Sequence, residues 1–492
     1  MLLFTSLNKV NSNKKGTEIM SKNGKKAALH NLGCKVNAYE TEAMQQLLEQ
    51  AGYEIVPFEP GADLYVINTC SVTNIADRKS RQMLHKAKKM NPEAVIVAAG
   101  CYVQTAKERT GLAVEADIIL GNNKKQNLLE ALEEYRRKQA QFPGGSAAVE
   151  REQEGHGKIQ EDDQGERQTK KPGGAAVHQE IIDINHTKEY ETLFLNRTEE
   201  HTRAYIKVQD GCNQFCSYCI IPYARGRARS REMEDVLREL RALAKNGVKE
   251  VVLTGIHLSS YGKDLGTSLL ELMKRVHELE GIERIRLGSL EPGIVTEEFA
   301  RTVSGMPKVC PHFHLSLQSG CDTVLKRMNR RYTTGEYLQR CEILRSYFVL
   351  PALTTDVIVG FPGETEEEFA RTVEFLKQVQ FYETHIFKYS IRKGTKAAQM
   401  PDQISESVKA QRSDVLSELN ERHKKLYEEA WLGRPCQILF EEKVTAEGKE
   451  YYTGYTKEYI KAFLAADQNY ENQILSGTLG REEGGLLILK RD

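Results

Sequence analysis

The sequence predicts an α/β protein in three parts: an amino-terminal parallel α/β domain, a central domain of repeated strand–helix units, and a small carboxyl-terminal β-barrel. Short apolar runs alternate with helical stretches through the first two parts, as they do in parallel sheets. The last part alternates β-rich runs with turns. A chain of 492 residues has room for about three domains of roughly 150 residues each, so length and pattern agree.

The composition is that of an ordinary globular protein without a strong net charge. Apolar residues make up 40% and charged residues 28%, which is enough for a sizeable core. Lys and Arg number 69, as do Asp and Glu, so the formal net charge is zero. No global field then draws the chain to nucleic acid or to an anionic membrane, and a polyanionic partner must be met by a local basic patch.

The chain contains no run of 18 apolar residues, and its first residues are too interrupted for a signal sequence. We predict a disordered leader over 1–25, a cytoplasmic location and no membrane partner. Ten cysteines in a reducing compartment favour metal ligation or catalysis over disulfides wherever they cluster. Four of them lack partners at ligand spacing and are predicted to be structural: Cys310, Cys321, Cys341 and Cys436.

Residues 26–136 are predicted to form the amino-terminal domain. Its strand candidates are apolar runs at 26–33, 64–69 and 94–100, and its amphipathic helix candidates are at 41–52 and 78–90. Strands and helices that alternate in this way form a parallel sheet.

Residues 137–196 are predicted to be a linker that is largely disordered. Between residues 141 and 180 the chain is rich in Gly, Glu, Gln and Lys, contains no Leu, and has Phe142 as its single aromatic residue. Such a segment cannot bury enough apolar surface to offset the entropy cost of ordering it.

Residues 197–430 are predicted to form the central domain. Its six strand candidates, separated by helical stretches, lie at 204–209, 250–255, 284–289, 312–317, 353–360 and 384–390. Six such units build either an incomplete parallel barrel or an open doubly wound sheet. In both cases right-handed crossovers bring the carboxyl ends of the strands to one face, where we expect the chemistry.

A charged helix predicted at 405–431 leads into the last domain, residues 431–492. There the β-rich runs are short and lie at 436–442, 450–464 and 486–490. Short strands joined by tight turns predict a small β-barrel.

The strongest chemical signal is a Cys-x3-Cys-x2-Cys run formed by Cys212, Cys216 and Cys219. It follows the first central strand, so three thiolates can converge at the carboxyl end of that strand. Three ligands are informative, because a structural zinc ion is usually held by four. A 4Fe–4S cluster held by three thiolates leaves one iron open to a small molecule. Zinc ligation and buried structural cysteines are the alternatives.

This run resembles the signature of the radical S-adenosylmethionine (SAM) superfamily, with Tyr218 as the aromatic residue before the last cysteine. The resemblance implies a partial (β/α)6 barrel and a 4Fe–4S cluster whose open iron binds SAM. One electron then cleaves SAM and yields a 5′-deoxyadenosyl radical. An electron donor such as flavodoxin or ferredoxin is implied as a partner.

Three further cysteines, Cys34, Cys70 and Cys101, follow apolar strand candidates by one to three residues. Neighbouring parallel strands would bring them to the same sheet edge, which suggests a second three-thiolate site. On spacing alone, three small core residues that cap strands are the plainer interpretation.

The segments LGCKVN, NTCSVT and AGCY around these cysteines resemble the three cysteine motifs of the methylthiotransferase family. The resemblance implies a second 4Fe–4S cluster on Cys34, Cys70 and Cys101, again with one open iron. In that family one SAM methylates a sulfur species held on this cluster, and a second SAM supplies the radical that removes hydrogen from an unactivated carbon. The methylthio group is then installed at that carbon, whose hydrogen no side-chain acid or base can abstract.

The resemblance also implies which side chains bind SAM. The turn Gly360-Phe-Pro-Gly-Glu364 lacks the Gly-Lys-Ser/Thr of a P-loop, so by itself it indicates an ordinary strand-to-helix turn. By resemblance, the expected SAM-binding residues are Tyr218, Gly255, Glu291, Gln318, Arg331, Gly360, Pro362 and Gly363.

Two basic stretches stand out in this neutral chain. Arg225, Arg227 and Arg229 follow the central cysteine run, and Arg78 and Arg81 lie on a helix candidate. A solvated helix face is the plainer interpretation of a lone basic stretch. Beside two cluster sites, however, we expect these arginines to contact RNA phosphates.

The carboxyl-terminal barrel resembles the TRAM domain, most clearly in the stretch GYTKEY at 454–459. TRAM domains usually bind RNA. Residues 433–492 hold eight Lys or Arg against ten Asp or Glu. Binding through this domain would therefore need shape or aromatic contacts rather than net charge.

Together these resemblances imply a tRNA-modifying radical SAM methylthiotransferase. The CKVN of the first motif resembles the branch that modifies carbon 2 of N6-threonylcarbamoyladenosine at tRNA position 37. The branch that acts on isopentenyladenosine usually has CQMN there, and the branch that acts on a ribosomal-protein aspartate usually has CPKN. Both stay open as alternatives. An alternative of another class is a non-catalytic, metal-containing protein that only binds RNA.

Overall fold

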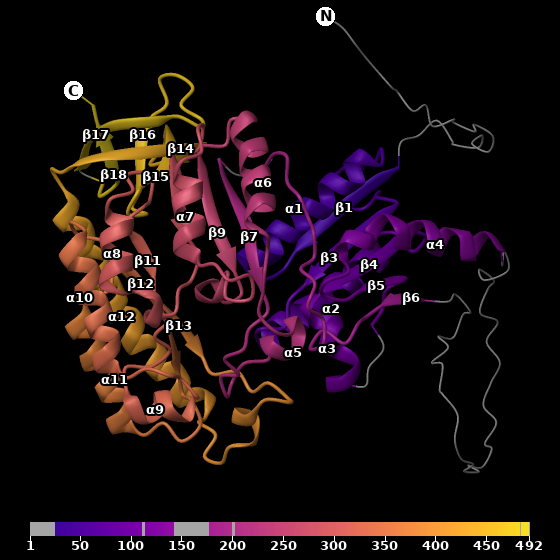
Figure 1. The fold of residues 1–492 in the computed structure, drawn as a ribbon, viewed down its shortest axis with the longest axis horizontal. Coiled ribbons are helices and arrows are strands. Elements are labelled where there is room, and N and C mark those ends of the chain that lie inside the picture. Colours follow the sequence, from indigo (N-terminus) through magenta and orange to yellow (C-terminus); the bar gives the residue numbers. More distant parts are fainter. Residues whose placement is uncertain (1–24, 111–113, 142–176, 199–201, 483, 492) are drawn as a thin grey trace, which may run out of the picture.

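The computed structural model describes residues 25–110, 114–141, 177–198, 202–482 and 484–491. The predicted leader, except for its last residue, and most of the predicted linker lie outside the described residues. Figure 1 shows the amino-terminal domain, the central domain and the carboxyl-terminal barrel as successive parts of one molecule. Within the described ranges, no helix combines the length and the apolar character needed to cross a bilayer.

The amino-terminal domain is a six-stranded parallel sheet in the order β2-β1-β3-β4-β5-β6. Its strands are β1 (Lys26–Asn31), β2 (Glu54–Ile55), β3 (Leu64–Thr69), β4 (Val95–Gly100), β5 (Ile118–Leu120) and β6 (His178–Glu180). Its helices are α1 (Lys35–Gln50), α2 (Asn74–Met90), α3 (Cys101–Thr110) and α4 (Leu128–Gln141), with a 3₁₀ turn η1 (Lys125–Asn127).

Strand β3 explains why this sheet is covered on both faces. All six of its residues are buried. Tyr65 and Ile67 pack into one apolar core, and Leu64 and Val66 pack into another. Because successive strand residues point to opposite faces, β3 needs helices on both sides of the sheet.

The segment predicted as a linker, 137–196, takes part in the fold where it is described. Helix α4 continues to Gln141, and His178 of β6 pairs with Ile118 of β5. Leu193 and Leu195 are buried in the core of the central domain. For these residues the linker prediction is corrected: a three-residue edge strand and two isolated leucines carry too little periodic signal to be detected beside the polar stretch.

The central domain is a partial barrel of parallel strands with helices on its outer side (Figure 1). Its strands are β7 (Arg203–Asp210), β8 (Arg229–Ser230), β9 (Glu250–Gly255), β10 (Arg284–Leu287), β11 (His312–His314), β12 (Ala352–Val359) and β13 (Glu383–Lys388). Strands β7, β9 and β10 are parallel and β8 is antiparallel at the edge, whereas β11, β12 and β13 form a second parallel sheet. Backbone pairing of Ile285 with Val309 and of Leu290 with Leu315 joins the two sheets.

The helices of this domain are α5 (Ile221–Arg225), α6 (Met233–Lys245), α7 (Leu269–His277), α8 (Glu297–Ser304), α9 (Asp322–Arg327), α10 (Thr334–Tyr347), α11 (Glu366–Val379) and α12 (Glu406–Trp431). Ala204, Ile206 and Val208 of β7 join the core formed with these helices. The alternate residues of β7, among them Arg203 and Lys207, therefore face the inside of the barrel. This alternation gives the barrel a polar interior.

The carboxyl-terminal domain is a closed five-stranded barrel in the order β14-β15-β16-β18-β17. Its strands are β14 (Pro435–Ala446), β15 (Lys449–Thr456), β16 (Lys461–Ala465), β17 (Ile474–Arg481) and β18 (Leu487–Lys490). Glu447 and Gly448, both at positive φ, form the two-residue turn between β14 and β15, as hairpin geometry requires. The predicted small barrel is confirmed.

This barrel docks against the amino ends of the central strands through aromatic contacts. The ring of Tyr459 stacks on His312 with centroids 5.0 Å apart, and the guanidinium of Arg286 lies 4.7 Å from the same ring. Arg203 lies 4.8 Å from the ring of Tyr455. The aromatic side chains of the TRAM-like stretch therefore pack on the central domain.

Candidate active site

The loop that carries Cys212, Cys216 and Cys219, the central cysteine triad, is held by its own backbone. Cys212 N–H donates to the carbonyl of Gly226 at 3.0 Å, and Cys219 N–H donates to that of Cys216 at 3.0 Å. Gly211 has φ +71°, and a Cβ there would clash with the carbonyl of Arg227. Glycine at this position therefore lets the two arms of the loop meet.

Burial makes the thiols of this triad costly to ionise when no metal is present. It raises the pKa of Cys212 to about 11 and that of Cys219 to about 12. Arg330 compensates in part, since its Nη1 donates to the sulfur of Cys216 at 3.3 Å. Three partly buried thiols beside a guanidinium form a donor set that suits a positively charged iron–sulfur core.

Cys34, Cys70 and Cys101, the amino-terminal cysteine triad, lie at the carboxyl ends of three neighbouring strands, β1, β3 and β4. Cys34 is exposed, whereas Cys70 and Cys101 are buried. A Cβ on Gly33 would lie 2.9 Å from the sulfur of Cys70, so the first two loops are in close contact. Burial, together with the charges of Cys101 and Cys34, raises the pKa of Cys70 to about 12. The three cysteines thus lie at neighbouring strand ends on one edge of the sheet, near enough for the charges of Cys34 and Cys101 to act on Cys70.

The spacing of the sulfur atoms bears on the zinc alternative. Zn–S bonds of about 2.3 Å in a tetrahedron put sulfur atoms about 3.8 Å apart. Among the described residues, the group whose ligand atoms all lie within 4.8 Å of one another is His314, Asp356 and His385, and neither cysteine triad meets that limit. In neither triad, therefore, are the three sulfur atoms already as close together as a tetrahedral zinc ion would hold them.

Arg225 links the segment after the central cysteine triad to the amino-terminal triad. It lies at the end of α5, six residues after Cys219, and is fully buried. Its Nε donates to the sulfur of Cys101 at 3.3 Å. Its other nitrogens donate to Glu40 at 2.7 and 2.9 Å, to Asn37 at 2.7 Å and to Asp210 at 3.2 Å. Helices α3 and α5 lie side by side in Figure 1 for this reason.

The charges around Arg225 do not balance without the cysteines. The buried cations of this network are Lys125, Lys207, Arg225 and Arg229, and its buried carboxylates are Glu40, Glu191 and Asp210. Burial would raise the pKa of Glu40, but the charges of Arg225, Lys125 and Lys207 outweigh it and hold that pKa well below its usual range. Four cations against three anions leave one positive charge, which a thiolate-bound cluster beside Cys101 would neutralise.

Glu291 is the centre of a polar group beside the central cysteine triad. Its Oε2 accepts a hydrogen bond from Gln214 Nε2 at 2.7 Å and lies 2.6 Å from His257 Nε2. Arg330 Nη2 lies 3.4 Å from its Oε1. Burial raises the pKa of Glu291, but His257 and Arg330 more than offset that effect and lower it. The carboxylate of Glu291 is therefore stabilised as an anion beside the guanidinium of Arg330.

The structure brings most of the predicted SAM-binding residues to the same end of the barrel. Tyr218 packs edge to face on Phe361 at 6.5 Å, so the turn that contains Gly360, Pro362 and Gly363 lies beside the cysteine loop. Gly360, at φ +70°, leaves room for the side chain of Lys409. A glycine at position 360 therefore allows Lys409 of α12 to pack closely against this turn.

Gly255 and Gln318 also lie at carboxyl ends of barrel strands. Gly255 ends β9, where an added Cβ would lie 2.8 Å from Gln209 Oε1. Gln318, at φ +73°, donates its backbone N–H to Asp356 at 2.8 Å and accepts from Ile358 at 2.9 Å. Their positions agree with the expectation that ligands bind on this face.

Arg331 does not join the group, and its neighbour does. Arg331 is exposed, whereas the side chain of Arg330 is 8% exposed and contacts Glu291 and Cys216. Arg330 also donates to the hydroxyl of Tyr332 at 2.9 Å. Of the two arginines, it is therefore Arg330 and not the predicted Arg331 whose side chain lies beside the cysteine loop: both lie in one loop, where no periodicity tells which side chain points inward.

The predicted RNA-binding arginines divide into two sets. Arg225 is fully buried and Arg229 is 2% exposed, and both belong to the internal charge network, so neither is free to meet RNA. That part of the prediction is corrected. Arg227, Arg78 and Arg81 are exposed. Arg227 lies over the ring of Phe215 at 4.7 Å, at the rim of the central cysteine loop.

Sequence reasoning missed Glu40, Gln214, His257 and Arg330. Glu40 lies six residues after Cys34, just beyond the first cysteine motif, and Gln214 lies inside the cysteine run itself. Proximity to a motif is the signal that could have found both of them. His257 follows Gly255 by two residues at a strand end, where a polar residue is a candidate by position.

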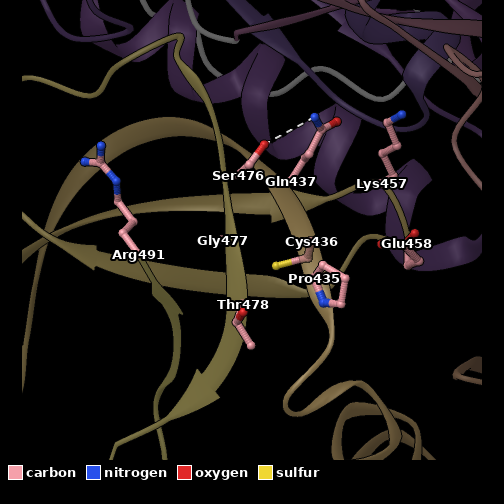
Figure 2. A pocket seen from close by; sticks show the side chains of 9 residues that line it. All are labelled: Pro435, Cys436, Gln437, Lys457, Glu458, Ser476, Gly477, Thr478 and Arg491. Atoms are coloured by element: carbon pink, nitrogen blue, oxygen red, sulfur yellow. Dashed lines mark hydrogen bonds between the residues drawn. The ribbon is translucent and has the colours of Figure 1, made fainter.

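A separate hollow lies on the carboxyl-terminal barrel (Figure 2). It is lined by Pro435, Cys436, Gln437, Lys457, Glu458, Ser476, Gly477, Thr478 and Arg491. The side chains of Gln437 and Ser476 are hydrogen-bonded across it at 3.4 Å. None of the residues of either cysteine triad lines it.

Comparison with known proteins finds two family models that match this chain. The model of the Radical SAM superfamily matches residues 206–376, and that of the Uncharacterized protein family UPF0004 matches residues 26–121. Each match contains one cysteine triad in full.

Several curated proteins are similar over most of the chain. The threonylcarbamoyladenosine tRNA methylthiotransferase MtaB of Bacillus subtilis (strain 168) is 39% identical over 91% of this chain and 92% of its own length. The tRNA-2-methylthio-N(6)-dimethylallyladenosine synthase of Caldicellulosiruptor saccharolyticus is 35% identical over 87% of this chain and 85% of its own. The solved structure of the radical SAM methyltransferase TsrM from Kitasatospora setae aligns with a TM-score of 0.48 and 15% identity over 74% of this chain and 75% of that chain.

Proposed function

Because the chain belongs to the radical SAM methylthiotransferase family, we propose that it adds a methylthio group to carbon 2 of N6-threonylcarbamoyladenosine at position 37 of tRNA. The observation that carries the proposal is the contact of Arg225 with Cys101. It ties the end of the central cysteine loop to the amino-terminal triad, so the two sites can serve one reaction.

We propose that Cys212, Cys216 and Cys219 hold one 4Fe–4S cluster and that Cys34, Cys70 and Cys101 hold a second. When bound, these clusters would supply the reductive cleavage of SAM and the site at which sulfur is carried. The residues around them orient the reactants and neutralise charge. Arg225 and Asn122 both donate to the sulfur of Cys101, at 3.3 and 3.5 Å, and fix its direction.

SAM is a zwitterion, and Glu291 with Arg330 offers it one anionic and one cationic side chain beside the central cysteine loop. Gln214 and His257 hold the carboxylate of Glu291 in place. Tyr218 and the turn that contains Gly360, Pro362 and Gly363 border the same end of the barrel. We propose that these residues bind SAM. Their positions around the cysteine loop would set the orientation of the bound SAM.

Replacing Arg330 should weaken SAM binding, whereas the same change at Arg331 should not. Arg330→Gln removes contacts to Glu291 and Cys216, and loss of a partner of this kind typically costs about 10- to 100-fold. Arg331→Gln is the matched control, because Arg331 is exposed. Isothermal titration of SAM into anaerobically reconstituted protein measures both affinities. Equal affinities for the two variants would contradict the assignment of Arg330.

Relatives that act on two different substrates match this chain at similar identity. The substrate is therefore inferred from the residues inside the barrel. MtaB proteins are 34–39% identical to this chain and the dimethylallyladenosine synthases 33–35%. The inner faces of the strands carry charged residues, among them Arg203, Lys207 and Asp356. A polar interior suits the threonylcarbamoyl group, which bears a carboxylate, better than a hydrocarbon group.

The proposal implies tRNA as partner and a low-potential electron donor such as flavodoxin or ferredoxin, in the cytoplasm. Arg227, Arg78 and Arg81 are exposed and are the proposed contacts to tRNA phosphates. The TRAM-like barrel would add contacts outside its aromatic docking face.

Mass spectrometry of tRNA nucleosides tests the proposed function. A strain that lacks the gene should lose 2-methylthio-N6-threonylcarbamoyladenosine. It should accumulate N6-threonylcarbamoyladenosine, which lacks the methylthio group. Re-expression of the wild-type chain should restore the product. Undiminished product in the deletion strain would reject this substrate. Loss of the methylthio form of isopentenyladenosine instead would assign the chain to the other tRNA branch.

The same tRNA assay does not exclude a protein that only binds RNA and metal, so a chemical assay is added. Reconstituted protein with dithionite and SAM should form 5′-deoxyadenosine. A non-catalytic protein would form none. Iron analysis supports the distinction, since two cubane clusters require about eight iron atoms per chain.

A further inference from the structure

The amino ends of the central strands form a charged floor inside the barrel. It consists of Arg203, Glu250, Arg284 and Arg286, closed from below by Tyr455 and Tyr459 of the carboxyl-terminal barrel. All four charged side chains are almost fully buried. Further along the strands, Asp356 and His385 pair in register and His314 lies beside them on the same inner surface.

The carboxylates of this interior are already engaged. Glu250 lies 2.9 Å from Arg286 Nε, 3.6 Å from Arg284 Nη1 and 3.7 Å from Arg203 Nε. Asp356 Oδ2 lies 3.2 Å from His314 Nε2, whose ring also contacts the hydroxyl of Thr354 at 3.0 Å. Each carboxylate therefore has its nearest partner within the barrel itself.

Lys35 approaches this interior from the amino-terminal domain. It directly follows Cys34 and is the first residue of α1. Tyr39 and Ala43 of α1 are buried in the core of the central domain, and residues four apart share a helix face, so Lys35 lies on the face of α1 that is turned to the barrel. The charges that act most strongly on its ammonium group are those of Arg286, Arg203, Asp356 and Glu250.

Lys35 is a cation for which the described residues offer no partner. In the part of the chain that the structure describes, its ammonium group makes no hydrogen bond and no ion pair, and the residue is exposed. The first turn of α1 also lacks an acidic residue, and Cys34 makes no side-chain cap there. The positive end of the helix dipole therefore adds to the charge of Lys35.

The numbers of cations and carboxylates around the barrel interior also indicate that Lys35 can take an anionic ligand. Its cations are Lys35, Arg203, Arg284 and Arg286, and its carboxylates are Glu250, Asp356 and Glu441, which is paired with Arg203. The three buried arginines are matched by the three carboxylates, so the remaining positive charge is that of the exposed Lys35, next to the cysteine that begins the amino-terminal triad. A bound anion would complete the balance.

We propose that Lys35 binds the carboxylate of the threonylcarbamoyl group and thereby selects this substrate over adenosines with an uncharged N6 substituent. The proposal rests on the proposed function and names the contact that decides specificity. Because Lys35 adjoins Cys34, a carboxylate held there keeps the modified base next to the amino-terminal triad.

The experiment compares two anticodon stem–loop RNAs that differ in one group: the threonylcarbamoyl carboxylate is free in one and amidated in the other. A charge-assisted contact should make wild-type protein prefer the free acid by about 10- to 100-fold, both in binding measured by fluorescence anisotropy and in kcat/KM. Lys35→Gln should abolish this preference and raise KM more than it lowers kcat. Lys35→Arg should restore most of it.

Lys245→Gln serves as the matched control, because Lys245 is an exposed lysine on the outer helix α6. It should keep the wild-type preference. If Lys35→Gln still prefers the free acid as wild type does, the inference is overturned. If wild-type protein binds the free acid selectively but does not modify it, the proposed function fails and the inference about Lys35 holds. Equal binding of both RNAs by wild-type protein overturns the inference directly.

Discussion

Replacing Cys34, Cys70 and Cys101 together by alanine should abolish methylthiolation while 5′-deoxyadenosine continues to form from SAM. The central triad lies on a different loop of a different domain, and its backbone hydrogen bonds do not involve these three residues. Iron should fall from about eight to about four atoms per chain, because one of two cubane clusters is lost. Chromatography of the SAM cleavage products, nucleoside mass spectrometry and iron analysis measure the three quantities.

Cys436→Ala is the control for this experiment, since it removes a thiol from the carboxyl-terminal barrel, where neither triad lies. It should leave iron content and both activities unchanged. Loss of 5′-deoxyadenosine formation in the triple variant would contradict the division of labour between the two sites. Unchanged iron content would contradict the second cluster.

Arg225→Gln should lower the free energy of unfolding far more than the same replacement at an exposed arginine. The guanidinium of Arg225 is fully buried, and its removal leaves Glu40 and Asp210 with fewer compensating charges. Breaking a buried pair of this kind costs about 3–5 kcal/mol in the free energy of unfolding. Chemical denaturation followed by circular dichroism measures this change.

Two further variants test the cause of that loss. Arg227→Gln is the matched control, because Arg227 is exposed and only two residues away. It should change stability little. Adding Glu40→Gln to Arg225→Gln should cost less than the sum of the single changes, since each removes the partner of the other. Additive losses would show that Arg225 acts through other contacts.

The cysteine triads illustrate how much of the site the sequence contained. A parallel sheet has a local signature, apolar runs alternating with helices, and its strand order puts consecutive strand ends at one edge. Cysteines placed at three such ends, and three more in one short loop, could therefore be grouped before the fold was known. In the structure β1, β3 and β4 are neighbours, as that argument predicts, so the first three cysteines lie at one edge of the sheet.

The basic residues show where local patterns fail. The run from Arg225 to Arg229 looks like a phosphate-binding patch, yet Glu40 accepts from Arg225 across 185 positions of sequence. Such pairing cannot be inferred from neighbours in the chain. The exchange of Arg331 for Arg330 has a similar cause, because side-chain direction in a loop follows from the tertiary contacts of Glu291 and Cys216 rather than from a period.

By itself the sequence determined the three-part α/β architecture, the six thiols and the family resemblance, because strand–helix alternation and short cysteine motifs are encoded by residues close to one another. Tertiary structure alone decided which charges are neutralised. It buried Arg225 against Cys101 of the amino-terminal triad and left Lys35 without a partner among the described residues. Charge balance depends on distances in space between residues that are far apart in the chain, so no local pattern in the sequence reveals it.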